Sequence, residues 1–264
     1  MMQQLNGKVA IVTGASKGMG RHFVAALVGA GMKVGCIARP SSELDSLTGE
    51  FGSAVLPLPC DIAEPAAVTA AINRAASHFG QVDVLVNNAA IFHPFAFEAG
   101  SDAMIRSHVD VNVLGLAWAT RAAIPHLRRT QGQIVNISSE SVRHPFPMLA
   151  LYAATKAAVE VLTEGLREEL RSEGIRLTVL RSGSVSGSSG SIGWSDETKQ
   201  KFYQKIVQTG HAAMSGSPAS PQSMAEGLLS ILGLPRDVSV DLVELRAAQE
   251  GLPEGAIAVR ESAA

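Results

Sequence analysis

Short runs of apolar, often β-branched residues alternate along the chain with longer Ala-rich stretches that contain apolar positions at helical spacing. The short runs predict buried strands, and the longer stretches predict helices. We expect strands at residues 8–13, 33–38, 54–58, 82–86, 133–137, 175–180 and 238–245. We expect helices at residues 19–30, 65–79, 101–129, with an interruption near Pro125, and 152–172. Apolar strands that are joined by helices indicate a parallel sheet covered on both faces.

The alternation of strands and helices continues without a linker or charge run that would mark a domain boundary. We therefore predict a single α/β domain over residues 1–264, of the doubly wound Rossmann type, with a mostly parallel sheet of about seven strands and helices on both faces. One stretch, residues 182–191, is rich in Gly and Ser. It is either a flexible linker or, because it follows the sixth predicted strand, part of a lid at about residues 184–216.

Composition narrows the class of protein. Hydrophobic residues make up 46% of the chain and charged residues 17%, which is typical of a folded protein with a sizeable core. The 22 basic residues nearly balance the 24 acidic ones, so nothing indicates a nucleic-acid-binding surface. The sequence shows no signal-peptide pattern and no apolar run long enough to span a membrane. We expect a cytoplasmic protein that binds neither nucleic acid nor a membrane.

The two cysteines and seven histidines suggest neither a disulfide framework nor a metal site. Cys36 and Cys60 lie in or beside predicted strands and are expected to be small buried apolar residues. The histidines show no metal-ligand spacing, so we predict no bound metal.

A glycine-rich turn, Thr13–Gly20, joins the first predicted strand to the first predicted helix. Gly14, Gly18 and Gly20 allow a sharp turn and a close approach of the backbone to a pyrophosphate. The helix N-terminus adds amide donors and a partial positive charge. Glycines also close ordinary loops, but a turn between a strand and a helix favours a nucleotide site.

Further motifs follow in order along the chain. Asn87-Asn88-Ala89-Ala90 follows the fourth predicted strand, Asp61 follows the third, and Asn112 lies in the long helical region. Ser139 ends the fifth strand, and Tyr152 and Lys156 open the next helix as Tyr-x-x-x-Lys. Together with the Thr-Gly-x-x-x-Gly-x-Gly turn, this arrangement resembles the short-chain dehydrogenase/reductase family over about residues 7–183.

The resemblance implies an oxidoreductase that transfers a hydride between a nicotinamide cofactor and a secondary alcohol or ketone. It also implies a homodimer or homotetramer. In the family, the residues equivalent to Ser139, Tyr152, Lys156 and Asn112 form the catalytic group. The cofactor-binding residues that we predict are Gly14, Ser16, Lys17, Gly18, Met19, Gly20, Arg39, Asp61, Ile62, Asn88, Ala89, Tyr152, Lys156, Gly183 and Val185.

The end of the second predicted strand indicates which nicotinamide cofactor is used. Enzymes that prefer NAD usually place an acid there for the adenosine ribose, but this chain has Ala38. Arg39 follows it, and Lys17 lies in the glycine-rich turn. Two cations suit a 2′-phosphate, although exposed Lys and Arg are also common on any surface. The missing carboxylate leads us to predict NADP(H).

The spacing of Tyr152 and Lys156 places both side chains on one face of a helix. A phenol has a pKa of about 10, and a nearby ammonium, together with the positive nicotinamide of the oxidised cofactor, favours the phenolate and lowers that value. Tyr152 is therefore expected to act as general acid or base, and Ser139 to donate a hydrogen bond to the substrate oxygen. The resemblance gives Lys156 a second role at the nicotinamide ribose, and gives Asn112 the role of holding a water that connects Lys156 to solvent. Each residue alone has an ordinary structural explanation; their combination does not.

The chain departs from the family pattern after the sixth strand. The family usually has Pro-Gly and then a Thr near the nicotinamide, whereas this chain has Ser182-Gly183 and Gly187, flanked by Ser186 and Ser188. Either serine is a candidate replacement for the Thr. The pocket candidates are Phe92, His93, Phe95, Glu140, Arg143, His144, Phe146, Trp194 and Tyr203. The aromatic members either stack on a cyclic substrate or pack the lid against the domain. We expect Arg143 to pair with a substrate carboxylate, solvent or Glu140.

Two other functions fit the same fold. One is a nucleotide-binding regulatory or scaffold protein, which would have no need of Ser139, Tyr152 and Lys156. The other is a dehalogenase-type lyase, which is expected to lose the glycine-rich turn and to carry Arg in place of Lys156.

Overall fold

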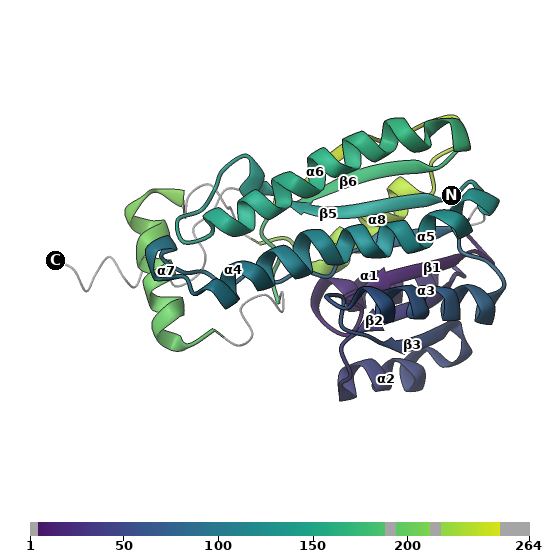
Figure 1. Cartoon of the computed structure of the whole chain (residues 1–264), viewed down its shortest axis with the longest axis horizontal. Coiled ribbons are helices and arrows are strands. Elements are labelled where there is room, and N and C mark those ends of the chain that lie inside the picture. The colour runs from purple at the N-terminus through teal and green to yellow at the C-terminus, as the bar shows by residue number, and fades with distance from the viewer. Residues whose placement is uncertain (1–4, 188–193, 212–217, 249–264) are drawn as a thin grey trace.

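In the computed structural model, residues 5–187, 194–211 and 218–248 are described (Figure 1). The strands are β1 (Val9–Thr13), β2 (Lys33–Ala38), β3 (Val55–Pro59), β4 (Val84–Asn87), β5 (Gln133–Ser139), β6 (Arg176–Ser182) and β7 (Leu242–Leu245). The helices are α1 (Gly18–Gly29), α2 (Ser42–Phe51), α3 (Pro65–Phe79), α4 (Asp102–Val109), α5 (Leu116–Thr130), α6 (Ala150–Leu170), α7 (Asp196–Gln208) and α8 (Pro221–Leu232). A π-helical segment, η4 (Asp110–Gly115), joins α4 to α5.

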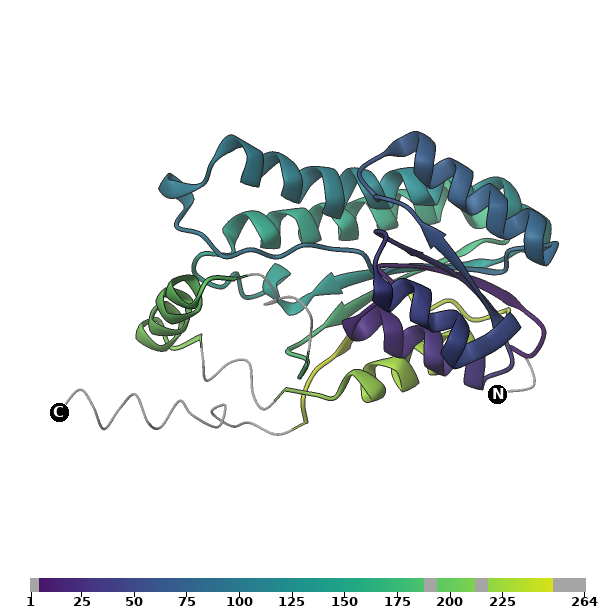
Figure 2. The ribbon, with the colours of Figure 1, turned by 90° about the horizontal axis from the view of Figure 1, so that it is seen from below.

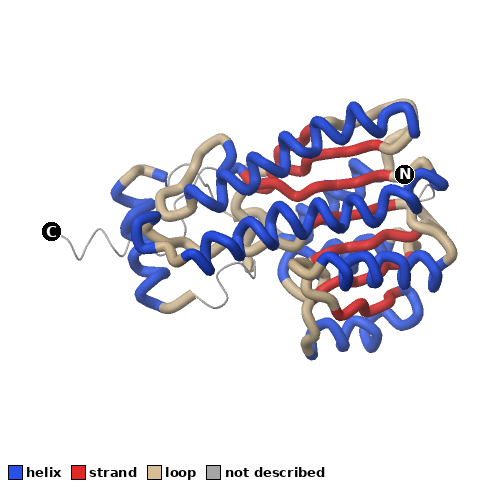
Figure 3. Tube along the Cα trace, in the orientation of Figure 1, coloured by secondary structure: helices blue, strands red, loops and turns tan. Residues whose placement is uncertain are grey.

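Within the described residues, seven strands form one sheet in the order β3-β2-β1-β4-β5-β6-β7, and every pairing is parallel. Figure 3 shows the strands in the middle of the molecule with helices around them. The sheet confirms the predicted doubly wound α/β fold. It also places the reversal of strand order between β1 and β4, where ligand crevices form in such sheets.

Two apolar cores cover the two faces of the sheet. Helices α1, α2 and α8 contribute to one core, and α3, α5 and α6 contribute to the other (Figure 2). Side chains alternate between them along a strand, so Ala10 and Val12 of β1 belong to the first core and Ile11 to the second. This two-sided burial explains why the strands are continuously apolar.

The structure corrects several predicted elements. Pro125 does not interrupt the helical region, because α5 continues through it; the irregularity is the π-helical segment at Asp110–Gly115. Pro125 leaves the carbonyl of Arg121 without its helical partner, and Arg121 is exposed, so water can replace that partner. Strand β7 starts at Leu242 rather than at Val238. The sequence analysis missed α2, α7 and α8.

Among the described residues, no helix combines the length and hydrophobicity that crossing a membrane requires.

Candidate functional site

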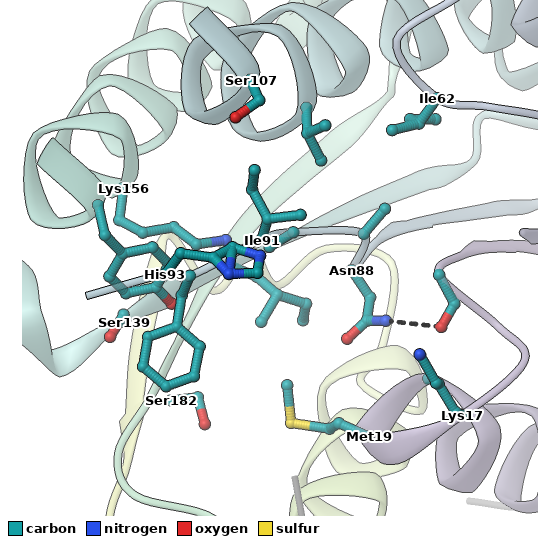
Figure 4. A pocket seen from close by; sticks show the side chains of 18 of the residues that line it. Lys17, Met19, Ile62, Asn88, Ile91, His93, Ser107, Ser139, Lys156 and Ser182 are labelled. Carbon is teal, nitrogen blue, oxygen red and sulfur yellow. Dashed lines mark hydrogen bonds between the residues drawn. The ribbon is translucent and has the colours of Figure 1, made fainter. Parts of the chain in front are cut away.

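A large cavity of about 1660 Å³ lies at the carboxyl ends of the central strands. Lys17, Met19 and Asn88 lie at one side of it, and His93, Ser139 and Lys156 lie at the other (Figure 4). We call these the nucleotide end, which extends to Arg39, and the substrate end, which extends to Tyr203. The cavity thus brings together the predicted residues of the glycine-rich turn and of the catalytic group.

The glycine-rich turn is packed too tightly for side chains at two positions. A Cβ at Gly20 would lie 2.1 Å from the carbonyl oxygen of Gly14. At Gly14, which has a φ of +67°, a Cβ would lie 2.9 Å from the Cα of Ala89. These glycines allow the turn to approach the chain that leaves β4.

Hydrogen bonds attach the chain after β4 to the same turn. The Asn88 side-chain amide donates to the carbonyl oxygens of Thr13 (3.0 Å) and Gly14 (3.3 Å). The Thr13 hydroxyl oxygen accepts from the backbone amides of Asn88 and Ala89, both at 3.0 Å. Asn88 and Ala89 therefore position the turn as well as line the cavity.

The N-terminus of α1 faces this end of the cavity. Its capping residue, Lys17, makes no side-chain cap, and its first turn carries no acidic residue. The first amides of the helix are therefore not satisfied by a cap and suit an anion. Ser16, Gly18 and Met19 lie in or beside this segment, and Ser16 is buried.

Arg39 lies in the cavity directly after β2, is exposed, and has no hydrogen-bond or ion-pair partner among the described residues. A carboxylate that the sequence analysis missed, Glu43 in the first turn of α2, also lines this end. Hydrogen bonds from its own backbone amide and from Ser41 lower the pKa of Glu43, and the charge of Lys17 lowers it further. Glu43 was missed because no helix was predicted from the sequence at Ser42–Phe51.

Asp61 and Ile62 lie on the rim of the cavity after β3, as predicted. A carboxylate oxygen of Asp61 accepts from the backbone amide of Ala63 at 2.9 Å and so fixes the turn. Ile62 packs against Gly115, where a Cβ would lie 2.9 Å from the Ile62 carbonyl oxygen.

The predicted catalytic side chains meet at the other end of the cavity. Ser139 ends β5, and its hydroxyl oxygen accepts from the amide of Ser141 at 3.2 Å. Tyr152 and Lys156 project from the first two turns of α6, with Lys156 Nζ 5.8 Å from the centroid of the Tyr152 ring. Lys156 is only 3% exposed, and its ammonium donates to the carbonyl oxygen of Ile137 at 2.8 Å.

Burial is the largest influence on the pKa values of Tyr152 and Lys156 in the protein without a bound ligand. It raises the pKa of Tyr152 to about 12, an effect that a hydrogen bond with Ser139 opposes and the charge of Glu140 reinforces. It lowers the pKa of Lys156 to about 8. The sequence analysis expected a lowered pKa for Tyr152. In the protein alone the pKa shifts the other way, because burial disfavours the phenolate; the part of the prediction that rests on the oxidised nicotinamide stays a prediction.

Asn112 lies within the π-helical segment and is 1% exposed. Its side chain accepts from the amide of Ile91 (2.8 Å) and donates to the Ile91 carbonyl oxygen (2.9 Å) and to the Thr155 hydroxyl (3.1 Å). It therefore attaches the loop after β4 to α6, one residue before Lys156. The water-holding role that the resemblance implies stays a prediction.

An ion-pair network supports α6 behind the predicted catalytic group. Glu160, one turn beyond Lys156, accepts from Ser138 at 2.6 Å and from Arg181 at 2.6 and 2.9 Å. Arg181 also pairs with Glu244 of β7 at 3.0 Å. Arg143 pairs with Glu244 as well (3.2 Å), so it does not pair with Glu140 as we had allowed.

Beside Ser139, the carboxylate of Glu140 is 6% exposed and pairs with Arg246 at 3.1 Å. The sequence analysis had no signal for Arg246, because the pairing depends on the position of the chain beyond β7.

Aromatic side chains form the outer part of the substrate end. The ring centroids of Phe92 and Tyr152 are 5.3 Å apart, and those of Phe92 and Trp194 are 4.9 Å apart. The indole N–H of Trp194 donates to the carbonyl oxygen of Phe92 at 3.1 Å. Of the two alternatives for the aromatic residues, these contacts show that Trp194 packs against the rest of the protein.

Part of the predicted lid lies outside the described residues, including Ser188. Ser186 donates to the carbonyl oxygen of Ala219 at 3.3 Å, and Val185 pairs with Ala219 as an isolated bridge. Gly183 donates its amide to Leu245 at 2.9 Å. Gly183 and Val185 line the cavity where the sequence analysis placed them.

Both cysteines are buried, and burial raises the pKa of Cys36 to about 12 and of Cys60 to about 11. Thiols with such pKa values are poor nucleophiles at neutral pH. Within the part of the chain that the structure describes, no group of three or more His, Cys, Asp or Glu residues is arranged to hold a metal ion.

The fold and the cavity define a Rossmann-type α/β protein with a glycine-rich turn. The sequence profile described as short chain dehydrogenase matches residues 8–197, so the chain belongs to the short-chain dehydrogenase/reductase family of oxidoreductases.

Relatives in this family are similar over nearly the whole chain. The farnesol dehydrogenase of Aedes aegypti is 33% identical, over 90% of this chain and 95% of its own. The structure of 3-ketoacyl-(acyl-carrier-protein) reductase from Brucella melitensis, complexed with NADH, has a TM-score of 0.80 and 30% identity, over 92% of this chain and 98% of its own. A closed form of serine dehydrogenase complexed with NADP+ has a TM-score of 0.81 and 26% identity, over 93% and 97%. Relatives of this fold have thus been solved with either nicotinamide cofactor.

Proposed function

We propose that this protein is an NADP(H)-dependent oxidoreductase that interconverts a secondary alcohol and a ketone, with Tyr152 as general acid and base. The observation that carries the proposal is the meeting of Ser139, Tyr152 and Lys156 in the same cavity as the glycine-rich turn. A protein that only bound a nucleotide would not need a phenol beside a buried ammonium in this cavity.

The nucleotide end fits a dinucleotide. Gly14 and Gly20 leave no space for a side chain, and the N-terminus of α1 offers amides that no side chain caps. We assign the pyrophosphate to this turn, the adenine to Asp61 and Ile62, and the nicotinamide side to Asn88, Gly183 and Val185. When bound, the cofactor supplies or accepts the hydride.

The cations at the end of β2 support NADP(H) rather than NAD(H). Arg39 has no partner among the described residues, and its guanidinium suits a 2′-phosphate. Glu43 is the competing feature, since a carboxylate there suits the hydroxyl of an unphosphorylated ribose. Lys17 offsets part of its charge.

The catalytic residues act on the substrate oxygen in the following way. In reduction, the phenol of Tyr152 transfers its proton to the carbonyl oxygen as the carbonyl carbon gains the hydride, which gives the alcohol. The Ser139 oxygen accepts from the amide of Ser141, which holds the hydroxyl beside Tyr152, and we assign its O–H as the donor to the developing oxyanion. Lys156, held on Ile137, favours the phenolate that results. In oxidation the same phenolate takes the proton back.

Tyr152→Phe tests the catalytic proposal. We expect a loss of kcat of at least about 100-fold, since removal of a general acid costs this much or more. NADPH binding, measured by the enhancement of its fluorescence, should stay within about threefold of wild type, because the phenol is expected to act in turnover rather than in affinity. Near-normal turnover in this variant would refute the proposal. Intact binding without turnover of any carbonyl by the wild type would favour a scaffold protein.

The choice of cofactor is tested with a pair of variants. Arg39→Ala should weaken NADPH binding by about 10- to 100-fold, the loss typical of one charge-assisted contact, and leave NADH binding nearly unchanged. Glu43→Gln should leave NADPH binding intact. A preference of the wild type for NADH, with loss of NADH binding in Glu43→Gln, would assign NAD(H) instead.

A further inference from the structure

The substrate end differs in chemistry from the nucleotide end of the same cavity. Its lining is dominated by apolar side chains from four separate parts of the chain. They are Ile91, Phe92, Leu149, Trp194, Phe202 and Ile206. A surface of this kind gains free energy by removing apolar area of a ligand from water.

The aromatic members form a continuous row that starts at the catalytic tyrosine. Phe92 contacts Tyr152, Trp194 contacts Phe92, and the Trp194 and Phe202 rings are 5.5 Å apart. The one polar atom of the Trp194 ring donates to the carbonyl oxygen of Phe92, so this ring needs no hydrogen-bond acceptor on a ligand. We call Phe92, Trp194 and Phe202 the aromatic row.

The described substrate end offers no counter-ion for an anionic substrate. Lys156 is the ammonium nearest the site, and it is held on the carbonyl oxygen of Ile137. Burial, and to a smaller extent the charge of neighbouring His108, lowers the pKa of His93 and so disfavours the charged form of that ring.

The acidic side chain beside Ser139 is already paired. Glu140 holds Arg246 at 3.1 Å, and burial, the largest effect, raises its pKa. The hydroxyls of Ser139, Ser141 and Tyr152 are neutral polar groups in the lining, and Ser141 Oγ is buried without a hydrogen-bond partner in the described structure. These groups suit uncharged oxygen atoms.

We propose that the substrate is a large uncharged ketone, or the corresponding secondary alcohol, whose apolar body packs on the aromatic row. This inference rests on the oxidoreductase activity proposed above and adds the class of substrate. A carboxylate or phosphate would lose its hydration at this end without gaining a partner, so anionic carbonyl compounds are selected against.

Ketones that are matched in length and differ in charge test the proposal. The holoenzyme is assayed with 2-decanone and with 9-oxodecanoate, which has a carboxylate in place of the terminal methyl group. We expect kcat/KM for 2-decanone to exceed that for 9-oxodecanoate by at least about 30-fold. We also expect 2-acetylnaphthalene to exceed 2-butanone by at least about 100-fold, because only the larger ketone covers the aromatic row. Equal or better use of 9-oxodecanoate would overturn the proposal.

Binding is measured separately from turnover. The chain has two tryptophans, and Trp118 does not line the cavity, so Trp118→Phe leaves Trp194 as the only one. Quenching of Trp194 by 2-acetylnaphthalene, but not by 9-oxodecanoate, supports the substrate class. Quenching without turnover would refute the oxidoreductase activity and retain the apolar site. Turnover that favours 9-oxodecanoate would support the oxidoreductase activity and refute the apolar substrate class. Absence of ketone binding would also overturn this inference.

Phe92 is the residue whose change should alter specificity. Phe92→Ala should raise KM for 2-acetylnaphthalene by about tenfold or more and change kcat/KM for 2-butanone by less than about threefold. If Phe92→Ala does not fold, Phe92→Leu keeps the apolar volume and should show the same trend with a smaller change. Equal effects on both ketones would show that Phe92 only positions Tyr152.

Discussion

The two ends of the cavity are held in different ways. At the nucleotide end, the surface is largely backbone, drawn together by Gly14 and Gly20 and by the hydrogen bonds that Thr13 and Asn88 make. At the substrate end, the surface consists of side chains from loops and from α7, connected by ring contacts and one indole hydrogen bond. One end is fixed by close approach of backbone atoms, the other by the packing of side chains.

This difference has a consequence for function. A backbone surface has little freedom to vary, because any added Cβ collides with it, and so it suits a ligand that never changes. A side-chain surface varies with each substitution and suits a site that determines specificity. Four variants test how sharply the two ends differ.

The largest effect is expected at Gly20. In Gly20→Ala the new Cβ would lie 2.1 Å from the Gly14 carbonyl oxygen, so the turn must open. NADPH affinity, measured by titration calorimetry, should fall by at least about 100-fold, since a displacement near 1 Å costs that much in a preorganised site. Gly29→Ala is the matched control at the other end of α1, where nothing lies within 4 Å of the new Cβ. Unchanged affinity in Gly20→Ala would remove the argument from close approach.

The second effect is expected at Thr13. Thr13→Val keeps the shape but deprives the backbone amides of Asn88 and Ala89 of their acceptor. We expect a loss of about 2–3 kcal/mol in the free energy of unfolding, measured with urea, because two partly buried donors lose their partner. Thr13→Ser, which keeps the hydroxyl, should lose less than half as much. Equal losses in both variants would assign the effect to packing.

The third effect depends on pH and concerns Lys156, beside Tyr152 at the substrate end. The fold lowers its pKa from 10.5 to about 8, so between these values the folded protein has released a proton that the unfolded chain still holds. The contribution of Lys156 to stability therefore rises with pH across this window. Relative to Lys156→Met, the wild type should gain about 2 kcal/mol between about pH 7.5 and 10. A difference that does not change with pH would mean that the ammonium stays charged in the fold.

The two ends of the cavity also differ in how many of their residues could be predicted from the sequence. Gly14 and Gly20 were predicted because a turn that approaches a pyrophosphate restricts the residue type, and Asn88, Tyr152 and Lys156 were predicted from the resemblance to the family. Of the aromatic row, Phe92 and Trp194 were predicted only as candidates, and Phe202 was missed, as were Glu43 and Arg246. Their contacts join segments far apart in the chain, which no local periodicity records. The raised pKa of Tyr152 likewise depends on burial by distant elements.

The smallest effect is expected at the substrate end. Trp194→Phe keeps an aromatic ring on Phe92 and removes only the indole hydrogen bond to the Phe92 carbonyl oxygen. Because Phe92 is only partly buried, we expect water to replace the indole as donor, so the free energy of unfolding should fall by less than about 1 kcal/mol. Urea unfolding of Trp194→Phe measures this loss. Trp118→Phe is the control, because its indole lies outside the cavity. A loss as large as that of Thr13→Val would show that the indole hydrogen bond holds the substrate end as firmly as the Thr13 hydroxyl holds the nucleotide end, and the division between the two would fail.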